Sequence, residues 1–314
     1  MESKTQLILS QVNQVIRGKE DVVRHVLLAI LAQGHVLLED VPGVGKTTMA
    51  NAFSKALGLS SKRIQFTSDT MPSDIVGFSV YDKEGKGLRY QPGAVMTNLL
   101  LADEMNRTSA KTQSALLEAM EEGAVTVDGK TRPLPQPFTV LATQNPLGSA
   151  GTQPLPNSQL DRFLLRLSMG YPDTDSQVEI LRQRHDGNPL ERVQPVVSSQ
   201  ELLELIRQAQ SVYVADSIYR YITQLAEASR SHPMVLLGIS PRGALALCRG
   251  ARARAFLEGR DYVIPQDVSG LLIPAWGHRL VLNAKARLRE MTPDQVLEEL
   301  LRQVPSPEQK SFRP

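Results

Sequence analysis

The sequence predicts an α/β protein in which a parallel sheet with inserted hairpins is followed by a small domain made only of helices. Two observations support this fold class. Short apolar runs alternate with stretches of helical periodicity through the first half of the chain, as in proteins whose parallel strands are joined by helices. After about residue 174 the strand-like runs disappear, and only helical periodicity remains.

The first predicted elements lead into a glycine-rich turn. Apolar residues recur at helical spacing from residue 5 to 33, and Gly18 interrupts them, so we expect two helices with a bend. The stretch "HVLLED" predicts a short buried strand, and "KTTMANAFSKALG" predicts a helix that Gly58 ends. Strand, glycine turn and helix therefore follow one another in this order.

Further strands are expected in "RIQFT", "NLLLADE" and "FTVLATQNP", with a helix in "KTQSALLEAMEEG" before the last of them. Two hairpins interrupt this alternation. One is expected in "GFSVYDKEGKGLRYQPGAV", and the other in "AVTVDGKTRPL", where Asp128-Gly129 is a strong signal of a tight turn.

The change of pattern sets the expected domain boundaries. Residues 1–173 are predicted to form the α/β core, residues 174–292 the helical domain and residues 293–314 a C-terminal tail. The last stretch, "VPSPEQKSFRP", is polar and rich in proline, which is typical of a frayed end.

Composition restricts the class of protein. A formal net charge of +2 is too small to indicate nucleic-acid binding by itself. The N-terminus has no signal-peptide pattern, and the longest purely apolar run, Val26 to Ala32, is too short to cross a bilayer. The one cysteine, Cys248, excludes an internal disulfide, and the histidines show no metal-ligand spacing. We therefore expect a cytoplasmic protein without membrane insertion.

The stretch "DVPGVGKTT", residues 40–48, matches the phosphate-binding pattern G-x-x-x-x-G-K-[ST], except that Asp40 replaces the first glycine. Glycines allow backbone N–H groups to surround phosphate oxygens, and the next helix points its positive end at them. Lys46 is expected to reach the β- and γ-phosphates of ATP, and the Thr47 hydroxyl to bind Mg²⁺. Asp40 lies farther from the phosphates, so we expect the loop to function. The predicted nucleotide-binding residues are Pro42, Gly43, Val44, Gly45, Lys46, Thr47, Thr48 and Asp103.

Two acids end the strand predicted in "NLLLADEMNR". Asp103 is expected to hold the metal, directly or through water, and Glu104 to polarise the attacking water as a general base. Adjacent acids are common at exposed strand ends. The pair is informative here because it follows a buried strand downstream of the phosphate-binding loop.

Three further residues complete the candidate catalytic set. Asn145, at the end of "FTVLATQNP", can orient the attacking water, although Asn145-Pro146 also fits a simple turn. Arg162 in "NSQLDRFLLR" and Arg242 in "ISPRGALAL" can stabilise charge that develops on a transferred phosphoryl group. A surface salt bridge is nevertheless the more common role of an arginine.

Together these motifs resemble the MoxR family of AAA+ ATPases, and the resemblance covers roughly residues 10 to 283. It rests on "LLEDVPGVGKTTMA", "LLLADEMNRTSAKTQSALLEAMEEGAVTVDGKT", "VLATQNPLGSAGTQPLPNSQLDRFLLR" and "SPRGALAL". In that family Asp is a familiar variant at position 40. The resemblance assigns Asn145 to sensor 1, Arg162 to the arginine finger that reaches the next subunit's ATP, and Arg242 to sensor 2 at the start of a lid helix.

The resemblance also implies an AAA+ P-loop NTPase core, a lid domain and a function. The two hairpins match the helix-2 insert and the hairpin before sensor 1. Members resemble chaperones that hydrolyse ATP to assemble or mature client proteins or to insert metal cofactors. ATP, Mg²⁺, a hexameric ring and a partner with a von Willebrand factor A (VWA) domain, which carries a metal-ion-dependent adhesion site (MIDAS), are implied. One departure is "AWGHRL" in place of "VLRHRL", which concerns lid packing around Trp276 and Gly277.

Three alternatives remain open. A nucleic-acid motor of the helix-2-insert clade needs a basic channel, whereas the hairpins carry charges of both signs, so nucleic acid is not the expected partner. A magnesium-chelatase-like motor subunit shares this architecture and differs mainly in its client. A scaffold that only binds ATP has no need of a catalytic base, and Glu104 favours an enzyme.

Overall fold

A computed structural model describes residues 3–40, 43–81, 87–145, 155–185 and 187–308 of the 314. The chain divides into two compact units, and each is considered by itself. Unit 1 comprises Met1–Leu27, His35–Leu155 and Leu167–Leu203. Unit 2 comprises Leu28–Gly34, Pro156–Arg166 and Glu204–Pro314.

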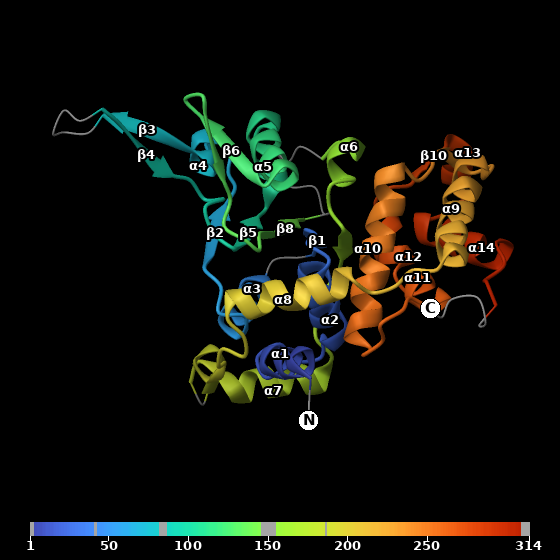
Figure 1. The fold of residues 1–314 in the computed structure, drawn as a ribbon, viewed down its shortest axis with the longest axis horizontal. Coiled ribbons are helices and arrows are strands. Elements are labelled where there is room, and N and C mark those ends of the chain that lie inside the picture. Colours follow the sequence, from blue (N-terminus) through green and yellow to red (C-terminus); the bar gives the residue numbers. More distant parts are fainter. Residues whose placement is uncertain (1–2, 41–42, 82–86, 146–154, 186, 309–314) are drawn as a thin grey trace. The chain divides into compact units, whose positions relative to one another are not determined.

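A five-stranded sheet forms the centre of the α/β fold (Figure 1), with strand order β2-β5-β8-β1-β9. The pairs β2–β5, β5–β8 and β8–β1 run parallel, which confirms the predicted parallel sheet. Strands β5 and β8 are buried along nearly their whole length, as expected of strands covered on both faces. The strands are β1 Val36–Glu39, β2 Ser61–Gln65, β5 Leu99–Asp103, β8 Thr139–Gln144 and β9 Leu165–Leu167. Strand β9 was not predicted, because three residues are too few to give a periodic signal.

The helices that precede and connect these strands agree with the predicted alternation. Gly18 has φ 66° and separates the first two helices, and a Cβ there would lie 2.2 Å from Ser176 Oγ, so glycine is required at this bend. The helical elements up to residue 210 are α1 Lys4–Asn13, α2 Glu20–Leu31, α3 Lys46–Ala56, α4 Pro72–Val76, η1 Met105–Arg107, α5 Ala110–Glu122, α6 Asn157–Leu160, α7 Thr174–His185, η2 Pro189–Arg192 and α8 Ser199–Gln210.

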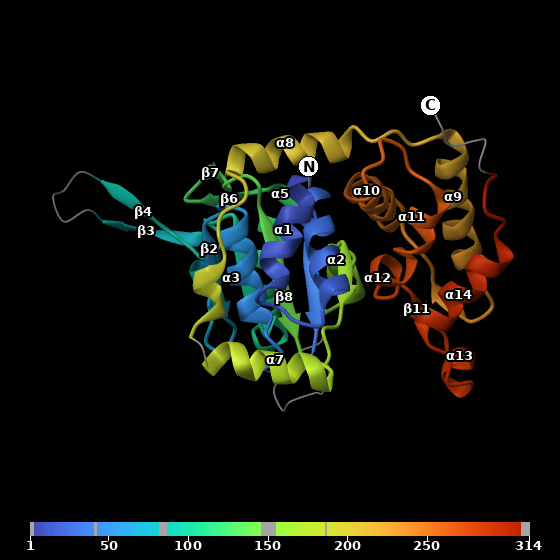
Figure 2. The ribbon, with the colours of Figure 1, turned by 90° about the horizontal axis from the view of Figure 1, so that it is seen from below.

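Both predicted hairpins are present in unit 1. Strands β3 Gly77–Tyr81 and β4 Leu88–Pro92 project away from the sheet in Figures 1 and 2, and the turn at 82–86 lies outside the described residues. Strands β6 Ala124–Val127 and β7 Lys130–Pro133 meet at Asp128 and Gly129, whose φ values of 52° and 70° match the predicted tight turn.

Unit 2 is mainly helical, as predicted for this part of the chain, but it also contains a small sheet. Strands β10 Val235–Leu237 and β11 Val281–Leu282 pair antiparallel, so the expectation that strands end near residue 174 was wrong. Two- and three-residue strands leave no alternation to detect. The helices after residue 210 are α9 Asp216–Ser231, α10 Pro241–Leu257, α11 Pro265–Ser269, α12 Leu272–Trp276, α13 Ala284–Leu288 and α14 Pro293–Gln303.

The unit boundaries differ from those expected at residues 173 and 292. Residues 174–203 group with unit 1, where Val196 N–H donates to the Ala56 carbonyl at 2.8 Å and Lys4 pairs with Glu201 at 2.7 Å. The predicted tail 293–314 begins with the packed helix α14, which a capping box at Thr292 starts. Its apolar face, Val296, Leu297 and Leu300, is buried.

The departure "AWGHRL" has a packing role in unit 2. Trp276 is fully buried, and its Nε1–H donates to the Gly243 carbonyl at 2.9 Å. A Cβ at Gly277 would lie 2.9 Å from the Ile273 carbonyl oxygen and 3.0 Å from Asp294 Oδ1, so a side chain has no room there. Trp276 therefore holds α12 against the start of α10, and Gly277 is small enough for the close packing beside it.

His278 is a buried titratable group of unit 2 whose pKa is strongly lowered. Its ring is buried, with Nε2 3.1 Å from the Phe163 carbonyl oxygen. Burial, and then the neighbouring Arg279 charge, lower the pKa of His278 well below its ordinary value of 6.5. His278 is therefore neutral in the folded protein, and its Nε2 also lies 3.0 Å from Arg279 Nη1.

We predict that His278 makes unit 2 less stable in acid. Because the folded pKa is depressed, the unfolded chain binds the extra proton below pH about 6.5, and stability falls as pH drops from 6.5 towards the folded pKa, by up to about 1.4 kcal/mol per pH unit. Unfolding can be followed by the fluorescence of Trp276, the one tryptophan of the chain. His278→Gln, whose amide side chain does not titrate, should unfold with a shallower pH dependence. Equal slopes for parent and variant would contradict this assignment.

Within the described part of the chain, no helix combines the length and the apolar character needed to span a bilayer.

Candidate active site

The predicted site residues of the α/β core gather at one edge of the sheet. Strands β1, β5 and β8 are parallel, so their carboxyl ends meet at this edge. Glu39 pairs with Gln144, and Asp40 N–H donates to the Gln144 carbonyl at 3.2 Å. The start of the phosphate-binding loop, the two acids at the end of β5 and Asn145 after β8 therefore lie at neighbouring strand ends.

The phosphate-binding loop has the backbone conformation that its glycines allow. Gly43 and Gly45 have φ 87° and 97°, and α3 begins directly after them at Lys46. A Cβ at Gly43 would have no heavy atom within 4 Å, so these glycines serve backbone conformation and leave space beside the loop. Thr47 and Thr48 follow in the first turn of α3, Val44 is half-buried, and Pro42 lies outside the described residues. Nζ of Lys46 donates to the Asp40 carbonyl at 3.2 Å.

Asp40, the departure from the usual loop pattern, is an anchor and points away from the loop. Its side chain is buried, and its Oδ1 accepts from Ser168 Oγ at 3.1 Å and from Gly170 N–H at 2.9 Å. Its Oδ2 accepts from Met169 N–H at 2.5 Å. Burying a carboxylate without hydrogen-bond donors costs free energy, and three donors offset that cost here. Asp40 thus ties the start of the loop to the segment after β9, a role that the sequence pattern did not reveal.

Asp40→Asn should destabilise unit 1 by about 1–3 kcal/mol, because an amide group placed at either oxygen opposes one donor with another. The ATP concentration for half-maximal hydrolysis should rise with it, since the loop loses its anchor. Thermal unfolding and steady-state hydrolysis measure both effects. Glu39→Gln is the matched control, because Gln144 Nε2–H can still donate to the new amide oxygen. Equal stability of the two variants would contradict the anchoring role.

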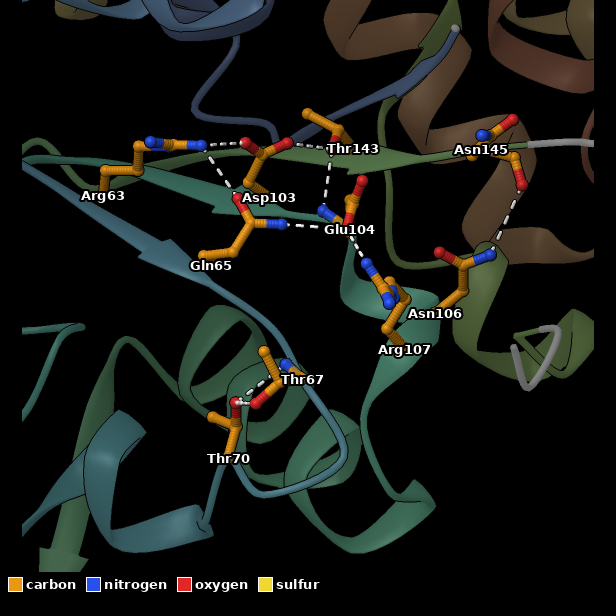
Figure 3. A network of polar contacts seen from close by, with 10 residues as sticks. All are labelled: Arg63, Gln65, Thr67, Thr70, Asp103, Glu104, Asn106, Arg107, Thr143 and Asn145. Carbon is orange, nitrogen blue, oxygen red and sulfur yellow. Dashed lines mark hydrogen bonds and ion pairs between the residues drawn. The ribbon is translucent and has the colours of Figure 1, made fainter. Parts of the chain in front are cut away.

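One threonine joins the two acids at the end of β5 (Figure 3). Thr143 is fully buried on β8. Its Oγ1–H donates to Asp103 Oδ1 at 2.6 Å, and the same Oγ1 accepts from Glu104 N–H at 2.8 Å. Sequence reasoning missed Thr143, although a hydroxyl two residues before the candidate catalytic Asn145 was a usable signal.

Each acid also has a side-chain partner from an adjacent element. Arg63 Nη2–H donates to Asp103 Oδ2 at 2.7 Å, while Gln65 Nε2–H and Arg107 Nη1–H donate to Glu104 Oε2 at 2.9 and 2.8 Å. Both arginines are half-exposed, so these ion pairs are weak and exchangeable. Glu104 has φ 56° and ψ 47°, a left-handed backbone that is uncommon for a side chain other than glycine.

The carboxylate of Asp103 and the hydroxyl of Thr47 are hard oxygen donors, the type that Mg²⁺ prefers, so this donor set fits the predicted metal. Asn145 is half-buried, and Asn106 Nδ2–H donates to its backbone carbonyl at 3.4 Å. The arrangement combines an anion-binding loop, two acids and an amide, as a site for phosphoryl transfer to water requires.

The two predicted arginines belong to unit 2. Arg162 is half-buried two residues after the end of α6, and Arg242 is exposed in the first turn of α10. Asp161, beside Arg162, accepts from Ser240 Oγ–H at 2.8 Å, and Ser240 is the N-cap of α10. The structure thus links the segments that carry both arginines, and Asp161 and Ser240 are residues that sequence reasoning missed.

Comparison with known proteins agrees with this geometry. Residues 35–165 match the model described as "ATPase family associated with various cellular activities (AAA)", and residues 227–300 match the AAA lid domain. Chaperone MoxR1 of Mycobacterium tuberculosis is 39% identical to this chain, over 95% of this chain and 81% of its own. The chain belongs to the MoxR family of AAA+ ATPases.

Other relatives of this MoxR-family ATPase match over almost their full length. The uncharacterised protein YeaC of Bacillus subtilis is 48% identical, over 96% of this chain and 95% of its own. A crystal structure from Cytophaga hutchinsonii, of a protein assigned as an ATPase, superposes with a TM-score of 0.91 at 38% identity, over 97% of this chain and 95% of that one. The predicted AAA+ core with a helical lid is therefore confirmed, and the protein is an ATP-hydrolysing enzyme.

Proposed function

We propose that this MoxR-family ATPase works as a hexameric ring in the cytoplasm and uses ATP hydrolysis to assemble or mature client proteins or to insert their metal cofactors. A separate protein with a VWA domain is the proposed partner. The observation that carries the proposal is the apolar surface of the β3–β4 hairpin, which suits contact with another protein.

Apolar side chains are exposed on both faces of this hairpin. Tyr81 and Leu88, which lie opposite each other in the register, are 80% and 62% exposed, and Phe78 on the other face is 48% exposed. Exposed aromatic and aliphatic groups on a projecting element are typical of surfaces that bind proteins. They favour a protein client.

Arg132 of the second hairpin is engaged by other groups of the protein. The Arg132 guanidinium lies 4.1 Å from the centre of the Tyr90 ring on β4, and its Nη1–H donates to the Val127 and Lys130 carbonyls. This arginine therefore supports packing between the hairpins, which disfavours the alternative of a nucleic-acid motor. A magnesium-chelatase-like motor differs mainly in its client, and the test below addresses that choice.

In the proposed site, Gly43, Gly45 and the first turn of α3 bind the phosphates of ATP, with Pro42, Val44 and Thr48 in the same loop. Lys46 contacts the β- and γ-phosphates, and Thr47 and Asp103 hold Mg²⁺, which neutralises phosphate charge when bound. Glu104 accepts the proton of the attacking water, and Asn145 orients that water. Arg162 stabilises the transferred group in the next subunit's site, and Arg242 contacts nucleotide from the lid.

Capture of clients on a hydrolysis-deficient ring tests the proposal. Glu104→Gln protein, bound to ATP, would be isolated from native lysate, and the proteins and nucleic acids that accompany it identified. Glu104→Gln combined with Lys46→Ala, which should not bind ATP, is the matched control. A VWA-domain protein or an incomplete metalloenzyme, absent from the control, would support the proposal. Nuclease-sensitive nucleic acid without a protein partner would overturn it in favour of the nucleic-acid motor.

A further inference from the structure

A single carboxylate in unit 2 organises the segment that carries Arg162. Asp161 follows α6 directly, and its side chain is 20% exposed. Oδ1 accepts from Arg279 Nε–H at 2.7 Å, and Oδ2 accepts from Ser240 Oγ–H at 2.8 Å. Both oxygens are engaged by donors from distant parts of the sequence, so Asp161 is a junction between three segments.

Arg279 holds the backbone on both sides of Arg162. Its side chain is only 3% exposed, and Nη2–H groups donate to the carbonyls of Asp161 at 3.0 Å and Phe163 at 2.6 Å. Nη1–H donates to the Leu164 carbonyl at 3.3 Å. A buried guanidinium with so many fixed partners leaves the backbone at Arg162 little freedom to move alone.

The same junction holds the start of α10. Ser240 Oγ accepts from Gly243 N–H at 3.0 Å while it donates to Asp161, so one hydroxyl both caps the helix and joins it to Asp161. A Cβ at Gly243 would lie 3.0 Å from Arg279 Cδ, which places the arginine stem directly against the residue after Arg242. The backbone at Arg242 is therefore held in place by the junction.

The charge around the junction is predominantly positive. Burial, followed by repulsion from Arg242, lowers the pKa of Arg249, and Arg242 and Arg249 both oppose the charge of Arg279. Asp161 forms an ion pair with Arg279. A group of like charges suits the binding of a multiply charged anion such as a nucleoside triphosphate.

We propose that Asp161, through Ser240 and Arg279, makes Arg162 and Arg242 move as one rigid body, so that nucleotide contact at one arginine sets the position of the other. Asp161 and Ser240 are then positioning residues for phosphoryl transfer. The proposal rests on the catalytic roles proposed above for Arg162 and Arg242. If Arg162 faces the neighbouring subunit's ATP and Arg242 its own subunit's ATP, the junction couples adjacent sites of the ring.

Ser240→Ala tests the link, because it removes the Asp161 contact without leaving Arg279 unpaired. We expect the rate constant of ATP hydrolysis to fall about tenfold, a change of about 1.4 kcal/mol in the barrier, with ATP affinity changed by less than about threefold. Ser240→Thr, which restores the hydroxyl, should recover most of the rate. Thr292→Ala is the matched control. It also removes a helix cap, the hydrogen bond that Gln295 N–H donates to the Thr292 hydroxyl at the start of α14, but it does so away from the junction.

The decisive measurement repeats Ser240→Ala in an Arg162→Ala background, with single-turnover hydrolysis of radiolabelled ATP. If Ser240 acts through the position of Arg162, its loss should cost less than about twofold there. A full tenfold loss in that background, or no loss in the parent, would overturn the link. Trp276 fluorescence, which reports the Gly243 contact, shows whether each variant is folded. Should Arg162→Ala alone keep the parental rate, the proposed role of Arg162 itself fails.

Discussion

Replacing Glu104 with glutamine is expected to leave ATP bound while its hydrolysis falls by about 10²–10⁴-fold, the usual contribution of a general base. The amide has the same shape as the carboxylate but cannot take a proton from water. Gln65 Nε2–H and Arg107 Nη1–H can still donate to the amide oxygen, so the side chain should keep its place. Release of inorganic phosphate measures turnover, and a fluorescent ATP analogue measures affinity.

Two comparisons make the Glu104 result specific. Lys46→Ala should lose both binding and turnover, because the lysine is expected to contact the phosphates themselves. Met105→Leu, a change in the buried residue that follows Glu104, should keep both if the local backbone is preserved. If Glu104→Gln kept its turnover within threefold of the parent, another group would have to act as the base.

Arg162→Ala should reduce the hydrolysis rate by about 10³-fold or more, within the range measured for arginine fingers, with little change in ATP affinity. The reason is that negative charge develops on the transferred group during the reaction, so the guanidinium stabilises the transition state more than bound ATP. Single-turnover hydrolysis and equilibrium ATP binding measure the two quantities separately.

Mixing subunits decides whether Arg162 acts on the neighbouring site. Arg162→Ala subunits keep an intact nucleotide site, whereas Lys46→Ala subunits keep an intact arginine, and each preparation should be inactive alone. A mixed ring should recover activity where an intact arginine faces an intact site. Mixed rings that form, as native mass spectrometry can verify, but remain inactive would contradict action between subunits.

The elements that could be predicted from the sequence are those with a long local pattern. The glycine turn at Gly43 and Gly45, the helix before Gly58 and the strand that ends at Asp103 each have a local sequence signal, and the structure contains all three. By contrast, β9, β10 and β11 are two or three residues long, and their pairing depends on partners far away in the sequence.

The candidate site shows the same division between local and distant information. Asp103 and Glu104 could be predicted because they end a buried strand, but their partners Arg63 and Gln65 lie on β2, about 40 residues earlier, and only the strand order brings them together. Asp161 is a similar case, since its partners Ser240 and Arg279 lie some 80 and 118 residues away. Such contacts have no periodicity to detect.

One missed signal was available in the sequence. The residues "TPDQ" at 292–295 form a capping box with proline at the first helical position, which predicts a helix start where a tail was expected. The proline-rich stretch that follows led to the prediction of a tail instead. Helix α14 instead packs three apolar residues into unit 2.

The dual use of the Thr143 hydroxyl has a consequence for sequence drift. Valine has nearly the same shape as threonine and suits a buried strand, so packing alone would let the two residues interchange during evolution. At position 143 that exchange would remove two hydrogen bonds at once, the one to a carboxylate oxygen of Asp103 and the one from the N–H of Glu104. Selection for turnover should therefore restrict this position to threonine or serine in active relatives, and an aliphatic residue there would mark a descendant that has given up hydrolysis.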